Sequence, residues 1–220
     1  GPFKYTHFNL AYSLLTPNPL DMDAGVYSGR LVYSVGPGGD IDFGDRTVAN
    51  DNNLTINFQL KVNASLKVDF PPGAYRAVLQ PVQGWQGWMN SGKPVPSLSA
   101  SHVFRIAGSG FFKAYLNCEH LIGQDCAIST DTGSDASQVP VDIAVSLPAS
   151  IVQWPGNQPA LKVPLKYGVE NAALFKMGGL HGSQSAKMHY DVRAEHVAEM
   201  VENPGSTYRG LATIIFDVNL

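Results

Sequence analysis

The residues with the clearest chemical potential are Cys118 and Cys126, the two cysteines of the chain. Seven residues separate them, a spacing that suits a disulfide closing a short hairpin or loop. Two reduced thiols are one alternative, and a zinc site that also uses His120 is another. The composition is typical of exported proteins, which favours the disulfide, and no second paired-ligand motif supports zinc. We therefore predict a Cys118–Cys126 disulfide and no metal site.

Two tryptophans, Trp85 and Trp88, lie in a glycine-rich stretch and are the best candidates for contact with a small ligand. An aromatic face can meet the apolar C–H groups of a sugar ring, so the pair would suit a carbohydrate-binding β-sandwich. Tryptophans in such a stretch more often cap a hydrophobic core or fill a domain interface. A secreted carbohydrate-binding module that uses Trp85 and Trp88 is therefore the alternative function.

Motifs of common catalytic chemistry are missing from the sequence. The six histidines are scattered without metal-ligand spacing, and no nucleophile elbow, P-loop or dinucleotide fingerprint occurs. Residues 178–182 are glycine-rich but lack the lysine and Ser/Thr of a phosphate loop, and they are predicted to form a turn. We expect no catalytic centre and no cofactor, and a secreted hydrolase is disfavoured because no carboxylate pair or triad stands out.

One acidic stretch has the look of a calcium loop. It carries Asp40, Asp42 and Asp45 among glycines, but it lacks the closing bidentate glutamate that calcium loops use. A solvated linker is the favoured interpretation.

The elements that must position these residues are predicted to be strands. The chain has 220 residues, of which 44% are apolar and 15% charged, and its 22 glycines and 15 prolines indicate many turns. This composition is typical of an all-β sandwich or barrel. A net charge of −3 gives no electrostatic case for nucleic acid or acidic membranes. No apolar run approaches the roughly 18 residues that span a bilayer.

The strongest strand signal is the run of residues 54–70. Its even positions are apolar and its odd positions polar, so a strand here buries one face and exposes the other. A single strand of this length would span roughly 56 Å, far more than an ordinary strand. We therefore expect a bend or break near Ala64–Ser65.

Other strands, and one short helix at residues 195–202, follow from alternation and from turn residues. The strands are predicted at residues 3–15, 26–35, 75–82, 102–107, 111–116, 139–147, 160–165, 186–194 and 207–218.

An internal repeat suggests how the chain is divided. A Tyr-x-Gly motif followed by an alternating strand occurs at Tyr27–Gly29 and again at Tyr208–Gly210. Coincidence is one interpretation, because so short a pattern can occur by chance in any β protein. The sharper interpretation is that each motif opens the last strand of a domain. Residues 1–50 would then be end strands of an upstream domain plus a linker, and residues 51–220 a second domain.

A family resemblance rests on the C-terminal stretch. Residues 197–200, Pro204–Gly205 and residues 208–217 resemble the closing segment of fimbrial subunits assembled by a chaperone and usher. They look most like class 5 (colonisation-factor-type) tip adhesins, the CblD-like pilus initiators. The run at residues 53–70 resembles the start of the pilin fold in that family, and the resemblance covers roughly residues 20–220. The chain departs from the family because most of the expected N-terminal adhesin domain is missing, so no receptor-binding residues are carried over.

The resemblance implies an immunoglobulin-like β-sandwich that lacks one strand. The gap would be filled by a periplasmic chaperone and then by the N-terminal donor strand of a major pilin subunit, after passage through an outer-membrane usher. It implies a protein of a Gram-negative bacterium that passes through the periplasm to the extracellular fimbrium tip and supports attachment to host cells. The host receptor would be bound by the missing upstream domain.

The donor-strand groove is predicted to have two walls. Ordinary core residues of a complete sandwich are the alternative interpretation for each of them. The predicted lining is Leu54, Ile56, Phe58 and Leu60 on one side and Ile214, Phe216 and Val218 on the other.

Overall fold

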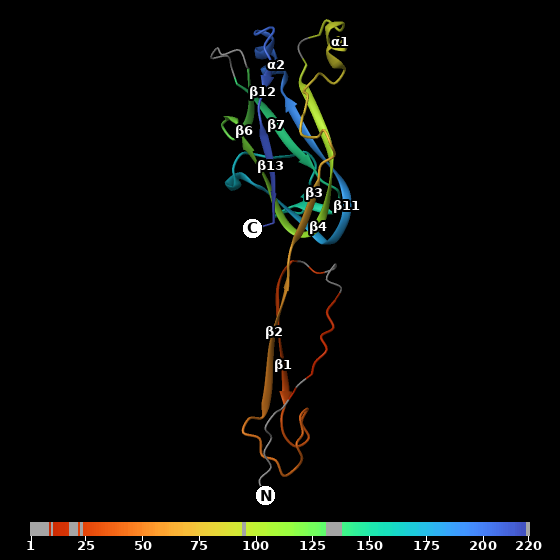
Figure 1. Cartoon of the computed structure of the whole chain (residues 1–220), viewed down its shortest axis with the longest axis vertical. Coiled ribbons are helices and arrows are strands. Elements are labelled where there is room, and N and C mark those ends of the chain that lie inside the picture. Colours follow the sequence, from red (N-terminus) through yellow and green to blue (C-terminus); the bar gives the residue numbers. More distant parts are fainter. Residues whose placement is uncertain are drawn as a thin grey trace.

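The chain folds into an all-β structure with two parts, a sandwich and a two-stranded ribbon that projects from one end of it (Figure 1). The computed structural model describes residues 9, 11–17, 22, 24–93, 96–130 and 138–218. The predicted fold class, an all-β sandwich, is confirmed. Of the strand predicted at residues 3–15, residues 3–8 and 10 lie outside the described part, and residues 11–15 form no strand.

The ribbon consists of β1 (Gly25–Ser34) and β2 (Asn53–Val62), which pair antiparallel over their whole length. The prediction of a strand at residues 26–35 is confirmed. Phe58 lies opposite Gly29, and its ring fills the space that a Cβ atom on residue 29 would occupy. An aromatic ring over a cross-strand glycine supplies the packing that the glycine lacks.

The acidic stretch that resembles a calcium loop lies in the connection between these two strands. The Asp40 carboxylate accepts hydrogen bonds from the Ser34 amide and hydroxyl, at 2.8 and 2.7 Å. Asp42 accepts from the amides of Gly38 and Gly44, at 3.0 and 2.7 Å. These hydrogen bonds stabilise the charged form and lower the pKa of both carboxyl groups. The two aspartates therefore organise a turn through local backbone contacts.

The expected break in the long alternating run is confirmed. The run stops at Val62 and resumes as β3 (Ser65–Asp69), which enters the sandwich. The division at residue 50 is corrected on one point: β2 was assigned to the second domain, but it pairs with β1 in the ribbon. Alternation identified the strand and its two faces, but it carries no information about which sheet the strand joins.

Two long strands form the centre of the sandwich, β4 (Leu98–Cys118) and β11 (Ala173–Val192), paired antiparallel. On its other edge, β4 pairs first with β3 and then with β13 (Ala212–Asp217). On its other edge, β11 pairs with β7 (Val139–Ser146) and β8 (Ile151–Gln153). Each long strand therefore pairs with two different shorter strands along its outer edge.

The remaining strands are short and lie at the periphery. β6 (Asp125–Thr130) extends the sheet from β7, and it also pairs with two minor strands. The minor strands are β5 (His120–Ile122), β9 (Gln158–Pro159), β10 (Val163–Pro164) and β12 (Tyr208–Arg209).

The core is filled by the inward residues of the long strands and of β7. Phe104 and Phe112 of β4 and Phe175 of β11 are among the largest fully buried side chains. Along β7 every second residue is buried, which is the pattern of a strand with one wet face. The described buried core contains no polar or charged residue.

Several sequence predictions are confirmed and others are wrong for identifiable reasons. The strand at residues 139–147 is β7, and the helix at 195–202 is α2 (Ala194–Val201). Residues 75–82 form no strand, because Pro71 and Pro72 precede them, Pro81 lies among them, and pairing is limited to the Gln80–Ser99 bridge. Residues 178–182 were predicted to be a turn, but they lie within β11 at two shifts of register, where glycines permit a bulge.

The other elements add little to the sheet. Only Val163–Pro164 of the strand predicted at residues 160–165 is paired. Two short helical segments, α1 (Gly84–Met89) and η2 (Val169–Asn171), lie in connections. Neither α1 nor α2, the α-helices of the described chain, is long and apolar enough to cross a membrane.

The bend of β4 depends on two glycines. The strands predicted at residues 102–107 and 111–116 are one strand, interrupted by Gly108 (φ 152°) and Gly110 (φ 79°). At Gly108, a Cβ would lie 2.1 Å from the carbonyl oxygen of Ser65 in β3. Glycine is therefore required both for the conformation and for the close approach of β3.

The Gly108→Ala substitution is expected to destabilise the sandwich by about 1–3 kcal/mol, because it combines backbone strain with a clash against β3. Urea unfolding measures the change. Gly178→Ala is the matched control, since a Cβ there meets nothing within 4 Å. Equal losses for the two variants would contradict the proposed role of the bend.

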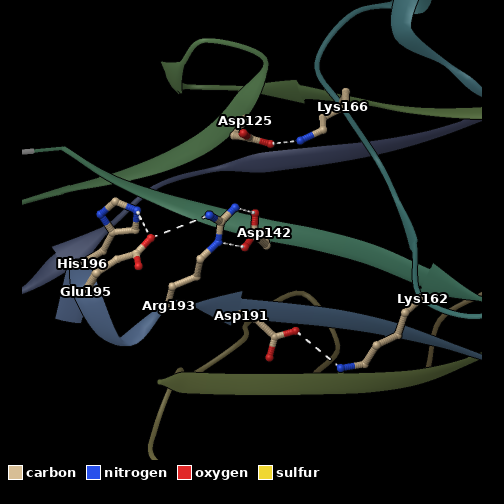
Figure 2. Close-up of polar contacts among 8 residues, drawn as sticks. All are labelled: Asp125, Asp142, Lys162, Lys166, Asp191, Arg193, Glu195 and His196. Atoms are coloured by element: carbon tan, nitrogen blue, oxygen red, sulfur yellow. Dashed lines mark hydrogen bonds and ion pairs between the residues drawn. The ribbon is translucent and has the colours of Figure 1, made fainter. Parts of the chain in front are cut away.

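Ion pairs attach the connections to the outer face of the sheet (Figure 2). The Arg193 guanidinium, just before α2, donates to both oxygens of Asp142 on β7, at 2.8 and 3.2 Å. Lys166 donates to Asp125 of β6, and Lys162 lies 3.9 Å from Asp191 of β11. The hydrogen bond from Arg193 holds the pKa of Asp142 below its ordinary value, against the opposing effect of burial.

This pair predicts an acid-dependent contribution to stability. A depressed carboxyl pKa stabilises the fold above the unfolded value of 3.8, and the contribution is lost as the pH falls through the lower folded value. Asp142→Asn is therefore expected to lower the urea midpoint at pH 7, with the difference fading below pH 3.8. Asp69→Asn, at the more exposed pair with Lys67, is the control and is expected to change little. A deficit of constant size across the titration would contradict the mechanism.

Candidate functional site

An apolar groove lies between β3 and β13. Its volume is about 400 Å³. We call it the β3–β13 groove, and its apolar lining consists of Leu66, Val68, Phe70, Ile214, Phe216 and Val218.

The groove exists because β3 and β13 use the same edge of β4. β3 pairs with residues 105–109 and β13 with residues 113–118, on either side of the glycine bend. The bend directs the two strands apart. Among the described residues, no other strand pairs with either of them. Two backbone edges therefore border one apolar channel, an arrangement that invites an additional strand.

A buried aromatic ring beneath the groove contacts both of its walls. Phe104 stacks on Phe70 with 4.8 Å between ring centroids, and it lies 5.8 Å from Phe216 on the opposite wall. Phe112 continues the series, 6.4 Å from Phe216 and 5.2 Å from Phe175. Phe104 and Phe112 are each only 1% exposed, whereas the wall residues Ile214 and Phe216 are half-buried.

A second depression continues the groove toward the disulfide end of the sandwich. Its volume is about 620 Å³, and it shares Phe70 and Ile214 with the β3–β13 groove. Val141 and Ile143 of β7, both buried core residues, belong to its lining. The two hollows together suit an extended segment better than a compact ligand.

Charge in the β3–β13 groove is confined to one position. Asp217 is the charged residue of the described lining, and its carboxylate lies 3.6 Å from the ammonium group of Lys113 on β4. The rest of the described lining is apolar. An occupant would therefore be held by backbone hydrogen bonds and apolar side chains.

One of the two predicted walls is corrected by the structure. Ile214, Phe216 and Val218 line the β3–β13 groove, but Leu54 to Leu60 do not, because they belong to β2 and pair with β1. Phe58 and Leu60 instead line a separate depression of about 780 Å³ together with Tyr27.

The residues that form the β3 wall of the groove were not predicted. Leu66, Val68 and Phe70 continue the same alternating run beyond its break. Their signal was present in the sequence, but the sheet joined by each half of the run was not.

The predicted disulfide between Cys118 and Cys126 is confirmed, with a Cα–Cα distance of 5.5 Å. It joins the end of β4 to β6. Cys118 pairs with Ala212, the first residue of β13, and Cys126 lines the second depression. The bond therefore links the end of β4, where β13 begins to pair, to β6.

The two tryptophans lie away from the groove, on α1. Their rings meet edge to face, with centroids 5.9 Å apart and an interplanar angle of 76°. Trp85 is 43% exposed. Two rings at this angle do not form one flat platform, and carbohydrate binding by the pair stays a prediction. Among the described residues, no three His, Cys, Asp or Glu side chains gather in a way that could hold a metal ion.

The chain matches no family model and no curated protein. Among solved structures, it is similar to a chain from a study of the chaperone–tip adhesin complex in CFA/I fimbriae biogenesis, with a TM-score of 0.34 and 12% identity. The match covers 90% of this chain and 53% of that chain, so this chain spans about half the length of its neighbour. A likeness of this size carries no argument about function.

The openness of the groove can be tested by truncating its wall. Phe216→Ala is expected to cost about 1–3 kcal/mol of stability, because the ring is already partly solvated. Phe175→Ala, at a fully buried ring of the same aromatic series, is expected to cost about 3–5 kcal/mol. Urea unfolding of both variants gives the comparison. Equal losses would mean that Phe216 is covered and that the groove is closed.

Proposed function

We propose that this chain is a fimbrial tip or minor subunit domain that joins an adhesin to the pilus shaft by donor-strand complementation. The sandwich would be an immunoglobulin-like fold lacking one strand. The observation that carries the proposal is the apolar β3–β13 groove, bordered by two strand edges whose Phe70 and Phe216 side chains both contact the buried Phe104. The sequence resemblance to class 5 tip adhesins supports it independently.

The chemistry of the groove fits recognition by strand addition. A strand placed between β3 and β13 can form main-chain hydrogen bonds with the free edges, while its alternate side chains fill the apolar channel. Such a strand would cover Leu66, Val68 and Phe70 on one side and Ile214, Phe216 and Val218 on the other. An uncovered groove of this kind favours aggregation, so a protein that carries it needs a partner from the moment it folds.

The partners proposed on this basis act in sequence. A periplasmic chaperone would fill the groove first, the outer-membrane usher would receive the complex, and the N-terminal strand of a major pilin subunit would replace the chaperone. The domain would then lie at the extracellular fimbrium tip and support attachment to host cells through an upstream receptor-binding domain. The groove offers apolar side chains, two backbone edges and the carboxylate of Asp217, a combination that suits the binding of a strand.

A peptide with the alternating pattern of a donor strand, taken from the N-terminus of a cognate major pilin, should stabilise the protein. At a peptide concentration about 100 times Kd, the expected gain is about 2.7 kcal/mol, which corresponds to a rise in Tm of roughly 5–10 °C. Thermal unfolding with and without peptide measures it. A peptide with its apolar positions shifted by one residue is expected to have no effect, because its side chains face the wrong way.

Two substitutions in β3 locate the effect. Val68→Asp places a charge in the groove and is expected to abolish the gain, whereas Lys67→Asp changes the opposite face of the same strand and is expected to preserve it. Stabilisation that survives in Val68→Asp would place the peptide elsewhere. No gain with any pilin peptide would reject the donor-strand proposal.

A further inference from the structure

Another hollow lies on the outer face of the sheet, separate from the β3–β13 groove and from the depressions described above. Its volume is about 460 Å³, within the range of small-ligand sites. On β11, Lys187, His189 and Asp191 face this hollow, and they alternate with the buried Met188 and Val192. We call it the outer pocket, and the residues used below are Gln80, Ser99, Ser101, Lys162, Lys187, His189 and Asp191.

One wall of the outer pocket is fixed by hydrogen bonds. The Ser146 hydroxyl on β7 accepts from the backbone amide of Lys162 at 2.9 Å, and it lies 2.9 Å from His189 Nε2. Lys162 has a φ of 47°, a left-handed conformation that costs an ordinary residue about 1–2 kcal/mol. The hydrogen bond that Lys162 donates to Ser146 helps to hold this strained residue against the strand.

The opposite wall is held by backbone pairing. Gln80 exchanges two hydrogen bonds with Ser99 of β4, at 2.9 and 3.2 Å. This bridge fixes the segment before α1 beside the outward hydroxyls of Ser99 and Ser101. The outer pocket is therefore bounded by restrained backbone on two sides.

The charges in the outer pocket are unequal. Lys162 and Lys187 supply two positive charges and Asp191 one negative charge, so the formal balance is +1. Figure 2 shows the Lys162 side chain reaching toward Asp191. No described carboxylate forms an ion pair with Lys187. Burial and the charges of the two lysines lower the pKa of His189, which is consistent with a neutral ring between two cations.

We propose that the outer pocket binds an acidic sugar, with the sugar carboxylate at Lys187 and its hydroxyls at the serine hydroxyls, Gln80 and Asp191. One surplus positive charge matches a ligand with a single negative charge. A doubly charged phosphate would meet repulsion from Asp191. An apolar acid would gain nothing from the hydroxyl and amide groups, which would stay hydrogen-bonded to water. The mixture of cations, an acceptor carboxylate and neutral hydroxyls is what a hydroxylated acid requires.

The two halves of this ligand can be tested separately. Glucuronate carries both the carboxylate and the hydroxyls, acetate only the carboxylate, and glucose only the hydroxyls. Titration of the isotope-labelled chain, followed by amide chemical shifts, is expected to show the tightest binding for glucuronate. The shifts should concentrate at residues 99–101 and 187–191 rather than in β3 and β13, which keeps this test independent of the donor-strand proposal.

Matched variants assign the contacts. Lys187→Gln is expected to weaken glucuronate binding about tenfold or more, because it removes a charge-assisted hydrogen bond. Ser101→Ala should weaken glucuronate but not acetate. Lys61→Gln, which makes the same charge change on the ribbon, should have no effect.

Three results would overturn the proposal. One is equal binding of acetate and glucuronate, and another is equal binding of glucose and glucuronate. The third is the absence of shifts at the outer pocket with any of the three compounds.

Discussion

The structure depends on the bend of one strand. β4 pairs with β3 through residues 105–109 and with β13 through residues 113–118, and the positive φ angles of Gly108 and Gly110 allow the strand to turn between these two segments. Because β3 and β13 pair with β4 on either side of that turn, they cannot pair with each other. The apolar channel between them is therefore a geometric result of the bend, and the buried ring of Phe104 contacts both of its walls.

Alternation of apolar and polar residues made much of the fold predictable. It located the strands that became β1, β2, β3, β7 and β13, and it placed the break between Val62 and Ser65. It failed where glycine changes the path of the chain. It predicts two strands, at residues 102–107 and 111–116, where the chain forms one, and a turn at residues 178–182, because alternation does not distinguish a bulge within a strand from its end.

Half of the candidate site was predictable for the same reason. The residues of β13 were identified by their own pattern, whereas the opposite wall was placed one strand too early in the chain. Strand pairing is decided by contacts between distant segments of the chain, and a local pattern gives no information about those contacts. The outer pocket was not predicted at all. Its residues come from four separate segments and share no motif, so only the folded chain brings them together.

The way in which the ribbon joins the sandwich has a mechanical consequence. β2 leads into β3 through residues 63–64, and β3 lies against β4 over five consecutive residue pairs. A pull on the ribbon along the long axis of the molecule would load these backbone hydrogen bonds together, in shear, rather than one after another (Figure 1). β3 would therefore resist sliding more strongly than peeling, and a strand seated beside it would share that tension.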